Sequence, residues 1–231
     1  NKLFDLHSTQ ESQVYLGLES ETVKINRAVR STRSLALFYK NELINAVFHS
    51  SSGGRTENSG EVWKYQFPYL KSVNDYDQNS TKYRWTYKFS SADLEKIFPD
   101  LGGINSIQII NKTNTDRVLQ MRLYGTKGKK IISGKYLRQK LQLLSTKFDV
   151  YFKFSQINLD NKLNFDKTIF DDSILQPLPP IPKDYFLFVK GYGAGHGVGM
   201  SQWGAKSMAE RGSSFREILK HYYTGVQIKT Y

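Results

Sequence analysis

The sequence contains no cysteine, no long apolar run and no recognisable leader. Without cysteine there is no disulfide framework and no thiolate metal site, and this absence leaves the cellular compartment open. No apolar run approaches the ~18 residues that a bilayer span requires. The first residue is Asn1 rather than methionine, and no signal peptide follows it. We therefore expect a mature or trimmed piece of a protein, with any leader or membrane anchor outside it.

Acidic residues are few relative to basic ones. The chain has 33 lysines and arginines against 21 aspartates and glutamates, a net charge of +12. Such a balance favours anionic partners, namely nucleic acid, an acidic membrane or a polyanionic cell wall. The basic residues are scattered, however, and the densest cluster is short (Lys127, Lys129, Lys130). Because no basic arm or basic helix stands out, we expect no nucleic-acid partner.

The middle of the chain predicts a compact lobe with the element order β-α-β-β-β-α-β. The strand over residues 118–125 alternates apolar and polar side chains, and Ser90 and Ser91 start a helix that ends before Pro99. The predicted strands cover residues 85–89, 104–111, 118–125, 129–132 and 148–154, and the second helix covers residues 134–143. A strand-rich segment of this kind is typical of an α+β lobe.

The flanking segments predict further strands and helices. The expected elements are a strand at 13–17, a short helix at 21–30, a hairpin of 35–39 with 43–49 and a strand at 185–190. A helix follows the glycine-rich stretch and is closed by Gly212. Ser214 and Glu217 form a capping box for a last helix that ends near Tyr223.

Together these patterns predict a β-rich α+β protein with two lobes and a groove between them. Its 231 residues are enough to bury a sizeable core. The main lobe is expected to consist of residues 1–77 plus 183–231. The α+β lobe at 78–155 is expected to be inserted into it. Residues 156–182, rich in Asn, Asp and Pro, are expected to be an excursion or linker.

The stretch GYGAGHGVGMSQ at residues 191–202 carries a glycine at every second position from Gly191 to Gly199. A phosphate-binding P-loop would need a lysine directly after its second glycine, but Gly204 is followed by Ala205 before Lys206, and the glycines do not give the dinucleotide pattern. The chain has four histidines and none forms a local pair at ligand spacing, so we expect no metal and no cofactor. Two interpretations remain: glycines that let backbones pack closely, or one wall of a shallow sugar-binding groove.

The stretch GHGVGMSQWGA at 195–205 resembles the signature of the sporulation stage II protein D / amidase enhancer family. The loop HSSSGGRTENSGEVW at 49–63 resembles that family's second block, and PYLKSV at 68–73 follows it in the expected place. The segments SGKYLR (133–138), LSTKF (144–148) and ILKHYYTGV (218–226) resemble its middle region and its end. The resemblance runs from about residue 13 to residue 231, and two long motifs in the right order make it specific.

The resemblance implies work on peptidoglycan outside the cytoplasm, in the cell envelope or periplasm. Family members are lytic transglycosylases that cut glycan strands without stem peptides, or amidase enhancers. One glutamic acid protonates the glycosidic oxygen, and the C6 hydroxyl of the muramic residue then closes a 1,6-anhydro ring. The family places that glutamate upstream of residue 1, so no catalytic residue is assigned here and Glu57 is the fallback. The alternative is a non-catalytic wall-binding or amidase-enhancing module.

The resemblance and the residue types together predict a glycan-binding site. The expected partners are peptidoglycan glycan strands and a cell-wall amidase, and a membrane only through an anchor outside this chain. Trp63, Trp85 and Trp203 are interpreted as packing residues. The residues expected to bind substrate are His49, Ser50, Ser51, Ser52, Gly53, Gly54, His196, Gly197, Gly199, Ser201 and Gln202. The serines have a second interpretation as loop caps, and His196 as a core hydrogen-bonding residue.

Overall fold

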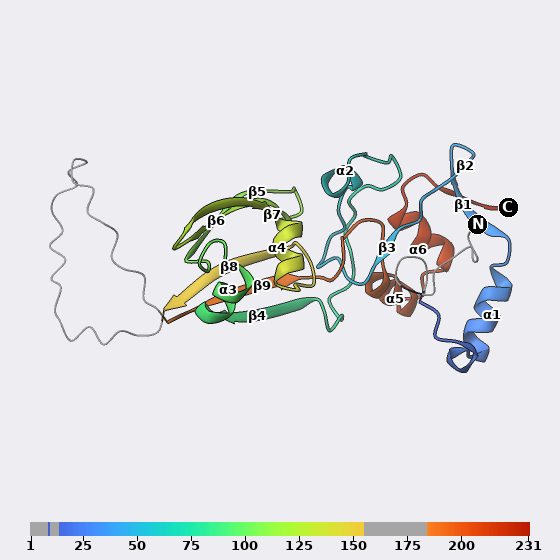
Figure 1. The fold of residues 1–231 in the computed structure, drawn as a ribbon. Coiled ribbons are helices and arrows are strands. Elements are labelled where there is room, and N and C mark those ends of the chain that lie inside the picture. The colour runs from blue at the N-terminus through green and yellow to red at the C-terminus, as the bar shows by residue number, and fades with distance from the viewer. Residues whose placement is uncertain (1–8, 10–13, 155–183) are drawn as a thin grey trace, which may run out of the picture. The chain divides into compact units, whose positions relative to one another are not determined.

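The computed structural model describes residue 9 and residues 14–154 and 184–231 (Figure 1). It contains two compact units, Asn1–Ile44 with Val226–Tyr231 (unit 1) and Asn45–Gly225 (unit 2). Short strands and short helices alternate along the chain, which confirms the strand-rich α+β class. The linker expected at 156–182 lies outside the described residues, and the expected lobe boundaries stay a prediction. None of the described helices has the length and apolar character of a membrane span.

In its described residues, unit 1 has a small sheet, one α-helix and a short 3₁₀ helix. Helix α1 (Val23–Ser31) begins at Thr22, whose hydroxyl accepts a hydrogen bond from the Ile25 N–H at 3.2 Å. Strand β1 (Leu35–Tyr39) pairs antiparallel with β2 (Glu42–Leu43) and with β11 (Gln227–Thr230). Residues 40 and 41 both have positive φ, as a two-residue hairpin turn requires. Of the strand expected at 13–17, residues 14–17 form no strand, and a 3₁₀ helix (Leu18–Ser20) follows.

The second strand of the expected hairpin is much shorter than predicted. Strand β2 ends at Leu43, and Phe48–His49 forms a separate strand, β3, in another sheet. Its partner is β10 (Met200–Ser201), which runs parallel to it with Phe48 opposite Met200. The prediction of one strand over 43–49 was therefore wrong, because a distant segment supplies the partner of its second half.

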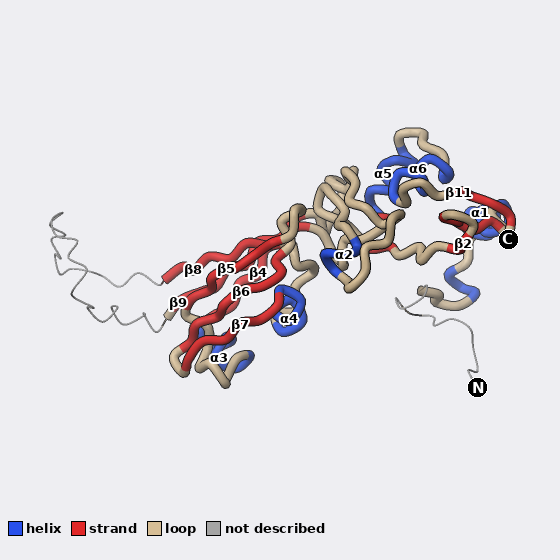
Figure 2. Tube along the Cα trace, turned by 90° about the horizontal axis from the view of Figure 1, so that it is seen from above, coloured by secondary structure: helices blue, strands red, loops and turns tan. Residues whose placement is uncertain are grey.

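Unit 2 contains the predicted β-α-β-β-β-α-β series. Its members are β4 (Arg84–Ser90), α3 (Ser91–Ile97), β5 (Ser106–Lys112), β6 (Val118–Gly125), β7 (Gly128–Ser133), α4 (Gly134–Lys140) and β8 (Phe148–Phe154). They build two three-stranded sheets in the orders β5-β6-β7 and β4-β9-β8. Strand β9 (Tyr185–Tyr192), which follows the undescribed segment, lies between β4 and β8 and is antiparallel to both. In both views α4 lies at the end of these strands that is nearer to α2 (Ser59–Val62) (Figures 1 and 2).

The core of these two sheets is built from alternate residues of β9 and from one face of each helix. Tyr185, Leu187 and Val189 are buried together with Leu94 of α3 and Leu137 of α4. Each such side chain contributes about 1.5–3 kcal/mol by leaving water. The buried residues of this strand therefore recur at every second position, as successive side chains of a strand point to opposite faces.

Trp85 fixes the point at which β9 leaves the sheet. Its ring lies so close to Gly191 that a Cβ there would be 2.2 Å from Cζ2 of the indole. Its indole N–H donates a hydrogen bond to the Gly193 carbonyl at 2.8 Å. Trp85 also packs against the core, which confirms the packing interpretation for this tryptophan. The glycine-rich stretch thus starts from a fixed position.

Two helices follow the glycine-rich stretch. Helix α5 (Gln202–Glu210) begins at Ser201, whose hydroxyl accepts a hydrogen bond from the Gly204 N–H at 3.1 Å. Helix α6 (Phe215–Tyr222) begins with the predicted capping box, since the Ser214 hydroxyl accepts from Glu217 and the Glu217 carboxylate accepts from Ser214. The two helices lie side by side in both views (Figures 1 and 2).

Candidate functional site

Backbone hydrogen bonds join the two sequence blocks that carry the family resemblance. Within these blocks we call residues 50–54 the serine–glycine turn and residues 191–199 the glycine strip. Ser51 and Ala194 exchange two hydrogen bonds, of 3.1 and 2.7 Å, and the Glu57 N–H donates to the Gly197 carbonyl at 2.8 Å. A Cβ on Gly193 would lie 2.5 Å from the Ser51 carbonyl oxygen, so only glycine allows this approach. The expected adjacency is found, whereas a role of these segments as walls of a sugar groove stays a prediction.

Two buried aspartates hold the serine–glycine turn. The Asp77 carboxylate accepts hydrogen bonds from the Ser51 hydroxyl (2.5 Å) and from the N–H groups of Gly53 (2.8 Å) and Gly54 (2.9 Å). The Asp75 carboxylate accepts from the Ser52 hydroxyl at 2.5 Å. Both serine side chains are buried, so these contacts favour the loop-capping interpretation of the two serines. Neither aspartate was singled out from the sequence.

The remaining predicted residues of the turn and strip differ in exposure. Ser50 is half-buried, and its carbonyl accepts from the Trp203 N–H at 3.1 Å. A Cβ on Gly199 would lie 2.1 Å from the Val47 carbonyl oxygen, so this glycine also permits a close approach. Ser201 is buried as the cap of α5, and Gln202 is exposed at the start of that helix.

His49 and His196 lie close together beside Trp63. The centroids of the two imidazoles are 5.5 Å apart, and the His196 and Trp63 rings are 5.2 Å apart. Nδ1 of His196 accepts a hydrogen bond from the Val198 N–H at 3.1 Å, so the proton of the neutral ring lies on Nε2. Burial lowers the pKa of His196 to about 4. Burial also holds the pKa of His49 well below its usual value, with further lowering by His196 and Arg117. Both rings are therefore neutral at pH 7.

These neutral imidazoles predict a loss of stability in mild acid. Below pH 6.5 the unfolded chain binds a proton at His196 that the folded chain binds only near pH 4. The free energy of unfolding therefore falls as the pH falls through this window, by about 3 kcal/mol from His196. Urea unfolding at successive pH values measures the slope, and His196→Gln is expected to flatten it. His221→Gln, at a histidine that hydrogen-bonds to the Asn74 carbonyl, is measured beside it as the control. A wild-type slope in His196→Gln would contradict the assignment.

Glu57, the fallback acid, is enclosed and fully hydrogen-bonded. Its side chain is 0% exposed, and its carboxylate accepts from the Asn58 N–H at 2.8 Å and from the Thr115 hydroxyl. These are the contacts of a carboxylate that fixes the loop and joins it to the hairpin of β5 and β6. A catalytic role for Glu57 stays a prediction.

Arg117, which no pattern in the sequence singled out, is a buried charge beside the glycine strip. It is 2% exposed, and Nη2 donates to the Ser52 carbonyl at 2.9 Å. A Cβ on Gly197 would lie 2.2 Å from Nη2, so the guanidinium rests directly on this glycine. Burial lowers the pKa of Arg117 to about 10, and the group stays protonated at neutral pH. In the sequence it follows Asn114, Thr115 and Asp116, a pattern typical of an exposed turn.

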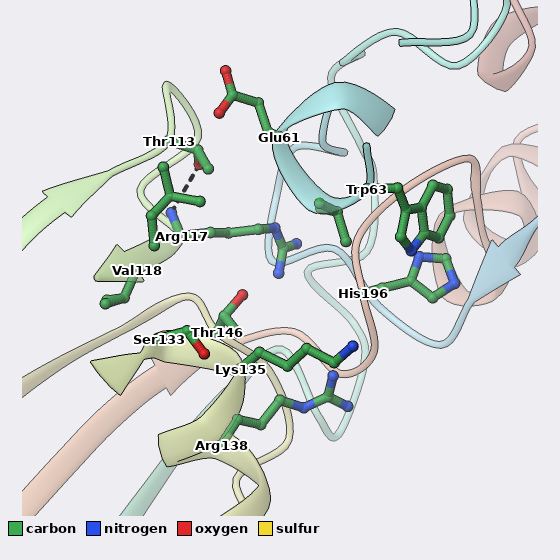
Figure 3. Close-up of a pocket in the computed structure, with 12 residues that line it drawn as sticks. Glu61, Trp63, Thr113, Arg117, Val118, Ser133, Lys135, Arg138, Thr146 and His196 are labelled. Carbon is green, nitrogen blue, oxygen red and sulfur yellow. Dashed lines mark hydrogen bonds between the residues drawn. The ribbon is translucent and has the colours of Figure 1, made fainter. Parts of the chain in front are cut away.

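A cavity of about 320 Å³ lies between Arg117, Trp63 and helix α4 (Figure 3). The segment around α2 contributes Glu61, Val62 and Trp63, and the glycine strip contributes His196. The remaining lining residues are Thr113, Arg117, Val118, Leu119, Ser133, Lys135, Arg138 and Thr146. Of the residues predicted to bind substrate, His196 lines this cavity and the others do not. Within the described part of the chain, no cluster of three or more His, Cys, Asp or Glu side chains is arranged to hold a metal ion.

Comparison with known proteins finds several relatives, although no protein-family model matches the chain. Stage II sporulation protein D of Bacillus amyloliquefaciens is 35% identical over 208 residues, which cover 89% of this chain and 51% of that protein. Stage II sporulation protein D of Bacillus subtilis (strain 168) is 34% identical over 213 residues, 91% of this chain and 52% of that protein. The amidase enhancer of Bacillus subtilis (strain 168) is 30% identical over 252 residues, 96% of this chain and 35% of that protein. The chain thus spans about half the length of the two sporulation proteins.

Proposed function

Since the chain belongs, over the part that it shares with these relatives, to the sporulation stage II protein D / amidase enhancer family, we propose that it acts on the bacterial cell wall. It binds the glycan strands of peptidoglycan in the cavity of Figure 3 and takes part in their cleavage, as a lytic transglycosylase does. The observation that carries this proposal is the position of His196, from the family signature, beside the Trp63 ring in a cavity whose lining combines apolar and polar side chains.

The lining of the cavity suits a sugar unit. A volume of about 320 Å³ lies at the lower end of the range of ligand pockets. Trp63, interpreted from the sequence as a packing residue, contributes an apolar surface to the lining, and Thr113, Ser133 and Thr146 contribute polar groups to it. An apolar surface next to a few fixed polar groups is the arrangement that orients a carbohydrate.

The chemistry that the resemblance implies needs one acid. A glutamic acid gives its proton to the glycosidic oxygen, the bond from C1 to that oxygen breaks, and the muramic C6 hydroxyl bonds to C1. The proton of that hydroxyl then returns to the carboxylate, so no water is consumed. None of the described residues is assigned as this acid, and the described part supplies the binding surface.

Trp63→Ala tests the cavity as the glycan site. Truncating an aromatic anchor in a binding pocket costs on the order of 1–2 kcal/mol, so glycan affinity is expected to fall about tenfold. The measurement is equilibrium binding to peptide-free glycan strands. Tyr65→Ala is the matched control, since Tyr65 lies two residues away, is exposed and does not line the cavity. Equal affinity of Trp63→Ala and the wild type would remove the cavity from the proposal.

A second candidate function is that of a module that enhances an amidase without cutting glycan. The name of the 30% identical relative, "Amidase enhancer", favours it. The two functions differ in their products. Anhydro-muramic ends after incubation with peptide-free strands identify cleavage. Unchanged strands, retained binding and a faster cell-wall amidase identify the module.

A further inference from the structure

The guanidinium of Arg117 has donors that its surroundings leave unused. Its Nε and Nη1 atoms are buried and have no hydrogen-bond partner among the described residues. Native proteins leave few buried polar atoms unpaired, and unpaired donors on a charged group are especially unfavourable. Two such atoms on one side chain that lines a cavity therefore point to a missing partner.

The same guanidinium is held in place before any ligand arrives. Nη2 is fixed by the Ser52 carbonyl, the face of the group rests on Gly197, and the Arg117 N–H donates to the Thr113 hydroxyl at 3.1 Å. A long side chain normally loses rotamer freedom when it binds a ligand, and here that loss has already occurred in folding. The arrangement is that of a binding group rather than of a solvated surface arginine.

The charges around the cavity favour an anion. Arg138 and Lys135 line it with Arg117, and Nε of Arg138 is fixed by the Leu143 carbonyl at 3.2 Å (Figure 3). The Glu61 carboxylate points away from these basic groups (Figure 3). Glu57 is near enough to act electrostatically on Arg117, but its carboxylate accepts from Thr115 and Asn58 instead.

We propose that this cavity is a carboxylate subsite, in which Arg117 and Arg138 bind a carboxylate carried by a muramic acid residue of the glycan strand. The inference rests on the proposed function and adds the chemical group that is recognised. Guanidinium groups pair with carboxylates through two parallel hydrogen bonds, which the neutral hydroxyls and acetamides of a glycan do not match. Two sources carry this chemistry: the lactyl group of a muramic residue without a stem peptide, and the stem peptide itself.

The test compares strands that differ only at the carboxylate. Four ligands are used with the full chain: peptide-free strands, the same strands with each lactyl carboxylate converted to a methylamide, strands with stem peptides, and a neutral chitooligosaccharide. Charge-assisted hydrogen bonds of this kind make a difference of about tenfold or more in affinity. We expect peptide-free strands to bind at least about tenfold more tightly than their methylamides.

Variants assign the difference to the cavity. Arg117→Met is expected to remove the preference for the carboxylate, so that peptide-free strands and their methylamides bind this variant with equal affinity. Because Arg117 is buried, Arg138→Gln provides a second variant at a half-buried position, with a smaller loss of preference. Arg122→Gln removes the same charge from β6 outside the cavity, and it is expected to keep the preference.

Each outcome has one meaning. Equal, measurable binding of peptide-free strands and methylamides overturns the carboxylate subsite and leaves the proposed function in place. Absence of binding to all four ligands overturns the proposed function. Tight binding of stem-peptide strands together with weak methylamide binding supports the subsite and includes the peptide carboxylate as a source. An equal loss of preference in Arg122→Gln and Arg138→Gln means general electrostatic attraction and overturns the assignment.

Discussion

Gly204→Ala is expected to destabilise unit 2 by about 3 kcal/mol or more. A Cβ on this helical glycine would lie 1.7 Å from Oδ1 of Asp75 and 2.2 Å from the Tyr222 hydroxyl oxygen. These two atoms share a hydrogen bond of 2.6 Å that passes directly over the glycine. Helix propensity alone would give a gain of about 1 kcal/mol for alanine, so the expected sign is the reverse of the usual one.

The free energy of unfolding from urea titrations measures this effect. Ala205→Gly, the neighbouring position in the same helix, is the matched control and is expected to cost about 1 kcal/mol. A Gly204→Ala protein as stable as the wild type would show that Asp75 and Tyr222 can separate without loss, contrary to the packing described here.

Asp77→Asn is expected to cost about 3–5 kcal/mol of unfolding free energy. The carboxylate is 0% exposed and accepts three hydrogen bonds from the serine–glycine turn. An amide has a single acceptor oxygen, and its NH₂ group would face an N–H donor. The change also removes a negative charge that stabilises the protonated forms of Arg117 and Lys147.

Asp100→Asn is the control for this substitution, because Asp100 is exposed on the same unit and a surface change of this kind stays within about 0.5 kcal/mol. Chemical denaturation of the two variants and the wild type at pH 7 gives the comparison. If both variants lost the same small amount, the turn would not depend on its buried carboxylate.

Elements specified by nearby residues were predicted well from the sequence. Strands β6 and β8 have the predicted bounds, because their side chains alternate and turn residues flank them. The helix starts at Ser90 and Ser214 were found because each capping box lies within four residues. These signals are local, so tertiary context did not have to be known.

Pairings between distant segments were not predictable in this way. Strand β9 pairs with β4 and β8, and no local sequence pattern indicates which strands a given strand will pair with. The strand expected at 43–49 divides because Phe48 and His49 pair with β10. The residues that the family motifs do not include, above all Arg117 and Asp77, escaped notice for the same reason. Each looks like an ordinary loop residue until its partner segment is in place.

Of the residues that line the cavity, His196 was predicted from the sequence as a site residue and most of the others were not. The family motifs identified two glycine-containing segments, and these segments lie together in the structure. Their glycines allow the two backbones to approach closely, which is one of the two interpretations made from the sequence. The cavity next to them takes most of its lining from the hairpin of β5 and β6 and from α4. A sequence gives no sign that a polar turn residue such as Arg117 will be enclosed, since its burial depends on the absence of a side chain at Gly197.

The long-range contacts around the glycine strip have a consequence for the order of folding. The hydrogen bond between Nδ1 of His49 and the Val198 carbonyl joins positions 149 residues apart, and Arg117 reaches across 65 residues to Ser52. Closing such large loops costs conformational entropy that nearby contacts do not incur. A chain that has completed the two three-stranded sheets of unit 2 but has not joined β3 to β10 therefore still lacks the contacts that hold the serine–glycine turn and the glycine strip together. The cavity beside them is completed only when these distant segments have met.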